Sequence, residues 1–255
     1  RFGLYHVDFE TKQRTLKESG NLYASIVKSH RRPQVVIMAG GLGTRLGEVT
    51  ETIPKSLVEV NGKPILTHIL DWAHKQGCLH ALVLTGHLGE QFEGFRHPRM
   101  AVKFHREASP LGTGGALWNA RALLEDRFIL LWGDDLHPID YTELINTHNE
   151  AKAPLTMCVT QAHAEMNLKH AKGILESYDK KQEQLDLNGY EAGTSIVEKS
   201  VVLEHGKDGV WSWEETVYPA LAGKAAIHLD NTPFWDMGTP ERLALLERFL
   251  KETAP

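Results

Sequence analysis

A glycine-rich stretch followed by two cations is the part of this sequence best suited to bind phosphates. Gly40, Gly41 and Gly43 follow a short apolar run, and Arg45 and Lys55 come after them. Glycines adopt backbone conformations that other residues avoid, so their N–H groups can approach phosphate oxygens closely. The planar donors of Arg45 also suit phosphate. These features predict a site for several negative charges, such as a triphosphate next to a second phosphate.

Two common phosphate-binding loops do not match this stretch. The dinucleotide pattern GxGxxG requires a glycine where Leu46 stands, and the P-loop requires Ser or Thr where Pro64 follows Gly62-Lys63. The remaining alternative is a plain strand-to-helix turn in which both cations are solvated. The length of the patterned stretch, residues 40–55, favours phosphate binding over that alternative.

Alternating strands and helices are expected to position this stretch. Buried strands are predicted by apolar runs at 35–38, 81–84, 128–132 and 155–160. Helices are predicted by the spacing of apolar residues at 66–73 and 117–124. Continuous apolar strands between helices indicate an α/β fold, a Rossmann-like three-layer sandwich with a mostly parallel central sheet. Ligands bind at the carboxyl ends of such strands, where the glycine-rich stretch and Gly133-Asp134-Asp135 stand.

The same stretch resembles the signature of a known family. Residues 39–46, followed by Ile53-Pro54-Lys55, resemble the sugar-1-phosphate nucleotidyltransferases, nearest to bacterial enzymes acting on hexose or heptose 1-phosphates, including guanylyltransferases. The similarity continues through 61–64, 85–90 and 110–116 and covers residues 34–250. The resemblance implies that the nucleotide is bound by Ala39, Gly40, Gly41, Gly43 and Thr44, and by Gly112 and Thr113 in a loop for the base and ribose.

The resemblance also implies a reaction and its two substrates. A nucleotidyl group passes from a nucleoside triphosphate to a sugar 1-phosphate, giving a nucleotide sugar and pyrophosphate. Such a displacement needs no protein nucleophile, so positioning and charge neutralisation supply the catalysis. The expected catalytic residues are Arg45, which steadies the departing pyrophosphate, and Lys55, which bridges the α-phosphate and the sugar phosphate.

Mg²⁺ is the expected cofactor, because phosphoryl chemistry with a triphosphate generally uses this ion and its oxygen ligands. Asp134 follows a predicted strand, as the family's first metal-binding aspartate does, and Asp236 lies in a segment resembling the family's late metal motif. Asp135 is adjacent and shares or replaces the role of Asp134. The alternative for Asp134 and Asp135 is a turn or a helix cap.

The sugar side is assigned by resemblance. Tyr178-Asp179-Lys180 resembles the segment that supplies the family's sugar-phosphate lysine, which makes Lys180 the candidate and leaves its neighbour Lys181 open. Glu191 and Gly193 resemble a turn that contacts the sugar, and a carboxylate accepts hydrogen bonds from two vicinal hydroxyls. The alternatives are a solvated turn for Lys180 and a surface acid at a strand start for Glu191.

Residues 1–33 form an N-terminal appendage outside this pattern, and residues 34–255 form the nucleotidyltransferase domain. The appendage resembles the C-terminal strand and helix of family 1 β-glycosidases, without either catalytic glutamate, so it implies no hydrolase activity. Leu22, Ile26 and Val27 predict an amphipathic helix over 17–29. A natural fusion, a fragment of a longer enzyme and a cloning artefact all remain open.

Composition excludes several other classes of protein. The 255 residues carry a formal charge of −5, with no long run of Lys or Arg, so we expect no nucleic-acid partner. No apolar stretch spans a bilayer and no signal-peptide pattern opens the chain, so we expect no membrane partner and a cytoplasmic location. Cys78 and Cys158 are expected to be buried thiols. We also expect no C-terminal β-helix of the kind some relatives carry.

One alternative function remains on the same fold, a non-catalytic sensor of nucleotide sugars. A sensor is expected to have lost one of the reacting groups, and Arg45, Lys55, Asp134 and Asp236 are all present. The base, the sugar and the oligomeric state are left open by the sequence.

Overall fold

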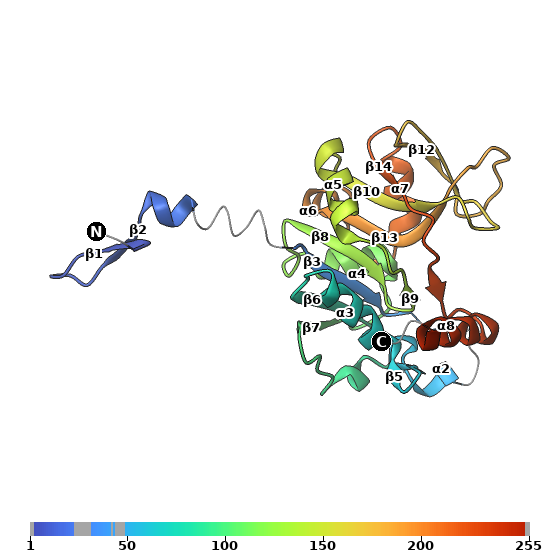
Figure 1. Cartoon of the computed structure of the whole chain (residues 1–255), viewed down its shortest axis with the longest axis horizontal. Helices are drawn as coiled ribbons and strands as arrows, with labels where there is room; N and C mark the ends of the chain where they lie inside the picture. Colours follow the sequence, from blue (N-terminus) through green and yellow to red (C-terminus); the bar gives the residue numbers. More distant parts are fainter. Residues whose placement is uncertain (1–2, 23–31, 42, 44–48, 253–255) are drawn as a thin grey trace. The chain divides into compact units, whose positions relative to one another are not determined.

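The computed structural model describes residues 3–22, 32–41, 43 and 49–252, and the chain divides into two compact units, Arg1–Arg32 and Pro33–Pro255 (Figure 1). In the first unit, β1 (Tyr5–Val7) and β2 (Arg14–Leu16) form an antiparallel hairpin, and residues 18–22 are helical. The hairpin adds a strand to the one expected there. Most of the predicted helix over 17–29 lies outside the described residues.

A nine-stranded sheet forms the centre of the second unit, with the strand order β11-β12-β14-β10-β13-β8-β3-β6-β7. In chain order these strands are β3 (Gln34–Ala39), β6 (His80–Thr85), β7 (Ala101–Arg106), β8 (Arg127–Trp132), β10 (Leu155–Thr160), β11 (Leu168–Ala171), β12 (Ile174–Tyr178), β13 (Tyr190–Glu198) and β14 (Ala226–Leu229). The four strands predicted from apolar runs are β3, β6, β8 and β10, and all four are confirmed.

The sheet is parallel across β8-β3-β6-β7 and between β10 and β14. Strand β13 runs antiparallel to both of its neighbours, β8 and β10, and β12 runs antiparallel to β11 and β14. The predicted parallel sheet is therefore confirmed in its core. The antiparallel strands were not predicted, because an apolar run indicates burial without giving the direction of the strand.

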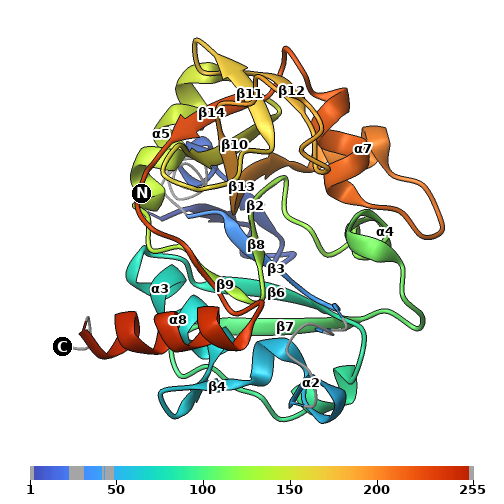
Figure 2. The ribbon, with the colours of Figure 1, turned by 90° about the vertical axis from the view of Figure 1, so that its right-hand side faces the viewer.

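Helices cover both faces of the sheet and complete three layers (Figure 2). One face is packed by α3 (Ile65–Lys75), α5 (Tyr141–Ala151) and α8 (Pro240–Glu252). The other face is packed by α4 (Gly112–Asn119), α6 (Lys199–His205) and α7 (Trp213–Ala220). The short elements are α2 (Val49–Thr52), η2 (Lys55–Leu57), η3 (Gly89–Phe92), β4 (Glu59–Val60), β5 (Lys63–Pro64), β9 (Asp135–Leu136) and β15 (Trp235–Asp236).

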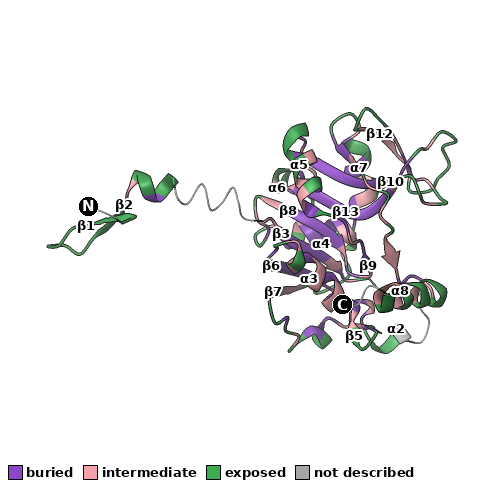
Figure 3. Ribbon diagram, viewed as in Figure 1, coloured by how far each residue is buried: buried purple, intermediate pink, exposed green. Residues whose placement is uncertain are grey.

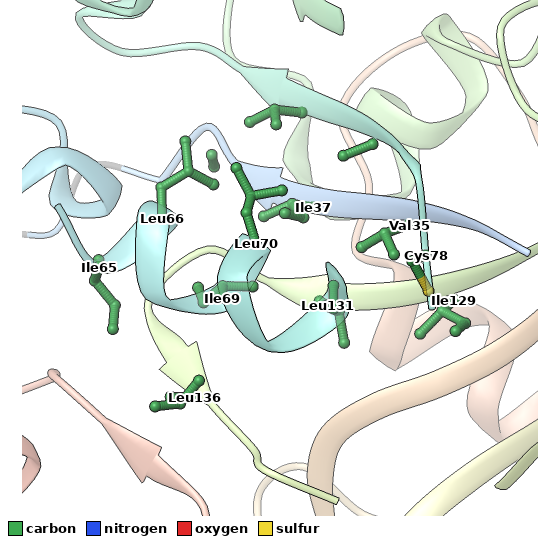
Figure 4. Close-up of a cluster of buried hydrophobic side chains, with 14 of the residues drawn as sticks. Val35, Ile37, Ile65, Leu66, Ile69, Leu70, Cys78, Ile129, Leu131 and Leu136 are labelled. Carbon is green, nitrogen blue, oxygen red and sulfur yellow. The ribbon is translucent and has the colours of Figure 1, made fainter. Parts of the chain in front are cut away.

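The alternation of side chains along β3 divides the core between the two faces. Val35 and Ile37 pack with Ile69 and Leu70 of α3, as Figure 4 shows, whereas Val36 faces the opposite cluster. Each buried aliphatic side chain of this kind contributes about 1.5–3 kcal/mol to folding. The strands at the centre of the second unit are accordingly buried (Figure 3). The loops at the edge of the sheet are therefore attached to a well-packed core.

The predicted helix over 117–124 was wrong in its bounds, since α4 spans Gly112–Asn119. The sequence Gly-Thr-Gly-Gly at its start has low helix propensity, but the carbonyl oxygen of Trp211 accepts hydrogen bonds from the N–H groups of Gly114 and Gly115, at 3.0 and 3.4 Å. A tertiary contact thus overrides the local preference.

Among the helices that the structure describes, none has the length and apolar character needed to cross a membrane.

Candidate active site

A cavity of about 450 Å³ opens at the carboxyl ends of β3, β6 and β8, where the sequence predicted a ligand site. Eight predicted site residues line it: Ala39, Gly40, Gly41, Gly43, Lys55, Gly112, Thr113 and Asp134. Its other walls include Thr85, Glu107 and Trp132. Thr44 and Arg45 lie outside the described residues, so their roles stay predictions.

The cavity contains an ion pair between a predicted catalytic residue and a predicted metal ligand. Lys55 is the first residue of η2, and its Nζ donates to Oδ2 of Asp134, the second residue after β8. The side chains are 13% and 30% exposed, so the pair is only partly screened by water. A Cβ on Gly133 would lie 2.5 Å from the Ser56 hydroxyl oxygen, so a glycine there allows the two segments to approach closely.

Two further aspartates, Asp135 and Asp236, lie beside this pair. Strands β9 and β15 pair antiparallel, with Asp135 opposite Asp236, and the N–H of Met237 donates to the carbonyl oxygen of Asp134 at 3.2 Å. Burial, and then the charges of Asp134 and Asp236, raise the pKa of Asp135 well above its usual range. Arg242 Nη1 donates to Oδ2 and Oδ1 of Asp236, at 2.9 and 3.1 Å, and the Gly238 N–H also donates to Oδ1, at 2.7 Å. Asp236 does not line the cavity.

These carboxylates supply hard oxygen donors, the type that Mg²⁺ prefers. Within the described part of the chain, no group of three His, Cys, Asp or Glu side chains is arranged to hold a metal ion. Mg²⁺ typically takes one or two carboxylates together with substrate phosphates and water. Asp134 and Asp236 therefore stay predicted metal ligands, with Asp135 and Asp236 brought opposite each other by the pairing of β9 with β15.

Glu191 and Gly193 lie inside β13, which corrects the prediction of a turn. The pairing of β13 with β10 shifts register between Met157 and Val159, and Gly193, at φ +73°, sits in the resulting bulge. The alternative of a surface acid for Glu191 is wrong, since this residue is 8% exposed. Its Oε1 accepts a hydrogen bond from the Gly193 N–H at 2.9 Å. Burial, followed by the charge of Glu214, raises its pKa to about 8.

Lys180 follows β12 and directs its ammonium group to Glu214, with 3.2 Å between Nζ and Oε1. Its side chain is 47% exposed and does not line the cavity. The neighbouring Lys181 donates its backbone N–H to Asp179 Oδ1 at 3.0 Å and its side chain is exposed. Only the first of the two lysines therefore has a described contact leading towards the cavity wall.

Two glutamates at the site were not predicted from the sequence. Glu107 follows β7 and lines the cavity, where burial raises its pKa and its Oε2 accepts the Leu111 N–H at 3.3 Å. The alternation of apolar and polar residues in β7 was a signal that would have placed Glu107 at a strand end. Glu214 lies in the first turn of α7, 101 residues along the chain from Thr113, the cavity residue that it contacts. No local sequence pattern indicates a role for it.

Comparison with known proteins identifies the family. A model of the family described as nucleotidyl transferase matches residues 34–213, which include the glycine-rich stretch, Lys55 and Asp134. The chain belongs to the nucleotidyl transferase family. Asp236 lies beyond the matched residues, so its assignment depends on the geometry beside Asp135.

Individual members of the nucleotidyl transferase family align with most of the chain. Mannose-1-phosphate guanylyltransferase catalytic subunit beta of Drosophila pseudoobscura pseudoobscura is 30% identical over 222 residues, covering 82% of this chain and 60% of that protein. D-glycero-alpha-D-manno-heptose 1-phosphate guanylyltransferase of Campylobacter jejuni is 28% identical over 222 residues, covering 82% and 96%. The crystal structure of HddC from Yersinia pseudotuberculosis complexed with GMP-PN is 27% identical, with a TM-score of 0.73, covering 86% and 100%. This chain thus spans less than two thirds of the Drosophila relative.

Proposed function

We propose that this chain transfers a nucleotidyl group from a nucleoside triphosphate to a sugar 1-phosphate, forming a nucleotide sugar and pyrophosphate. The observation that carries the proposal is the cavity at the carboxyl ends of β3, β6 and β8, where glycine backbone, Lys55 and Asp134 meet. Family membership supports the same reaction class. The glycine N–H groups suit the phosphates of the triphosphate, and the lysine charge suits the point where two phosphates meet.

In the proposed reaction, an oxygen of the sugar phosphate attacks the α-phosphorus. The bond from that phosphorus to the bridging oxygen of the β-phosphate breaks, and pyrophosphate leaves. Lys55 stabilises the negative charge that redistributes over the α-phosphate, and Arg45 is assigned to the departing pyrophosphate. Mg²⁺ bound by Asp134 and Asp236 would neutralise charge on the phosphates. In this structure the negative charge of Asp236 itself is neutralised by Arg242, whose Nη1 lies 2.9 Å from Oδ2.

We propose guanosine triphosphate as the nucleotide, because of the hydrogen-bonding character of Glu107 in the cavity wall. The carboxylate of Glu107 only accepts hydrogen bonds, and the Watson–Crick edge of guanine offers two adjacent donors, N1–H and N2–H₂. Uracil and thymine offer one N–H between two carbonyl oxygens, which a carboxylate repels. Both relatives named above are guanylyltransferases, and the HddC complex contains GMP-PN. The same relatives act on mannose 1-phosphate and on a heptose 1-phosphate, so we propose that the sugar belongs to one of these two classes.

The base assignment is tested by changing the carboxylate to an amide. Glu107→Gln keeps the shape but provides one donor and one acceptor, which suits uracil or thymine better. The ratio of kcat/KM for GTP to that for UTP should fall on the order of a hundredfold, since a site built around hydrogen bonds discriminates strongly. Glu93→Gln, at an exposed position after η3, is the control with the same loss of charge. A ratio equal to that of the control would refute guanine recognition by Glu107.

A further inference from the structure

The carboxylate of Glu214 connects two parts of the site. Its Oε2 accepts hydrogen bonds from the hydroxyls of Thr113 and Ser212, at 2.5 and 3.2 Å. Its Oε1 accepts from Lys180 Nζ at 3.2 Å. The Glu214 side chain is 13% exposed, so these contacts lie largely out of water. One carboxylate thus joins a wall of the nucleotide cavity to the candidate sugar-phosphate lysine.

The Thr113 end of this connection is rigidly held. Thr113 is the second residue of α4 and lines the cavity, and its hydroxyl oxygen also accepts the N–H of Trp213, at 2.8 Å. Ahead of it, Gly112 adopts φ +69°, and a Cβ there would lie 2.5 Å from the carbonyl oxygen of Trp211. The starts of α4 and α7 are therefore fixed to each other. Glu214, which lies in the first turn of α7, is therefore fixed relative to the cavity wall at Thr113.

The Lys180 end depends on Glu214 for its direction. Lys180 lies in a turn after β12 with a half-exposed side chain, and a free lysine side chain samples many rotamers. An ammonium group has three donors, and Glu214 takes one, which leaves two for phosphate oxygens. Glu191 also faces this group, but burial raises the pKa of its carboxyl to about 8, which favours its neutral form. Glu214 is then the main anionic partner of the lysine.

We propose that Glu214 is a positioning residue that holds Lys180 in register with the nucleotide cavity, so that the sugar phosphate binds next to the α-phosphate. This inference rests on the proposed function. Glu214 does not touch the reacting atoms; it acts through Thr113 and Lys180. Orientation of two reactants is a large part of catalysis by positioning, so a small displacement of Lys180 is costly.

The first test is Glu214→Gln, which keeps the side-chain shape and removes the charge that holds Lys180. The KM for the sugar 1-phosphate should rise by about tenfold or more, the range expected for a lost hydrogen bond to a charged group. Calorimetric affinity for the triphosphate alone should change by less than about threefold, since the cavity wall is retained. Glu215→Gln is the matched control, because Glu215 is the next residue in α7 and is exposed.

Two further measurements keep the test decisive if Glu214→Gln folds poorly. Thr113→Val removes the hydroxyl that anchors Glu214 and should raise the KM for the sugar 1-phosphate, whereas Thr113→Ser should restore it. In a Lys180→Ala background, Glu214→Gln should add little to the KM, because the two residues act as one unit. Equal KM values for the Glu214 and Glu215 variants, or full additivity with Lys180→Ala, would overturn the inference and leave the proposed function standing. Absence of pyrophosphate release by the wild type with every substrate pair would overturn both.

Discussion

Replacing Glu191 by Gln should change how the stability of the protein depends on pH. Glu191 is 8% exposed, and its Oε1 accepts the Gly193 N–H at 2.9 Å. Burial, and then the charge of Glu214, raises the pKa of this carboxyl from 4.5 to about 8. Glutamine keeps an oxygen that can accept the same hydrogen bond, but it carries no charge at any pH.

The sign and size of the effect follow from the pKa difference. Because the folded state binds this proton more tightly than the unfolded state, the contribution of Glu191 to the free energy of unfolding is fully present below the unfolded pKa. That contribution is lost as the pH rises towards the folded pKa of about 8. One pKa unit corresponds to about 1.4 kcal/mol, so the wild type should lose about 2.5 kcal/mol relative to Glu191→Gln between pH 5 and pH 7.

Urea unfolding of both proteins at several values between pH 5 and pH 7 measures this difference. Other titrating groups are shared by the two proteins and largely cancel. Glu150→Gln, at an exposed position on α5, is the control and should differ from the wild type by a constant amount. If the wild type and Glu191→Gln also differed by a constant amount across this range, the buried, protonated state of Glu191 would be refuted.

Three further predictions concern the reacting groups and the N-terminal unit. Asp134→Asn or Asp236→Asn should greatly lower turnover, while urea unfolding shows that the fold is retained. If either variant kept wild-type turnover at limiting Mg²⁺, that residue would not be a metal ligand. Lys55→Ala should lower the single-turnover rate on the order of a hundredfold with little change in calorimetric triphosphate affinity, because the charge of Lys55 acts mainly in the transition state. Arg45→Ala should weaken triphosphate binding as well, and normal turnover with weak triphosphate binding in Lys55→Ala would contradict this division of roles. A chain starting at Arg32 should transfer nucleotide at the full-length rate, since the family match begins at residue 34, and a folded but inactive truncation would give the first unit a role in the reaction.

The central part of the fold follows from simple sequence patterns. The apolar runs of β3, β6, β8 and β10 are strands because only burial on both faces of a sheet accommodates them, and α3 shows its apolar face at helical spacing. The bulge at Gly193 and the antiparallel direction of β13 depend on pairing with β8 and β10. Such pairing joins residues far apart in the chain, and no local pattern encodes it.

The candidate site divides in the same way. Lys55 and Asp134 were expected near each other, because both follow segments at one edge of the sheet, and the structure pairs them. Glu214 was missed because its importance comes from contacts with Thr113 and Lys180, residues that the fold alone brings together. The burial of Glu191 was missed for the same reason, since a single acid in a sequence gives no indication of what will cover it.

The most direct test of the account is the reaction itself. The purified full chain is incubated with Mg²⁺, GTP and either mannose 1-phosphate or a heptose 1-phosphate, and the products are quantified by ³¹P NMR against an Asp134→Asn control. The account predicts that a GDP-sugar and pyrophosphate form in equal amounts with one of these sugars, and that the control forms almost none. The contrary result is a folded wild type that binds the nucleotide sugar tightly but releases no pyrophosphate with any pair of nucleoside triphosphate and sugar 1-phosphate. That result would contradict the account and favour a non-catalytic sensor.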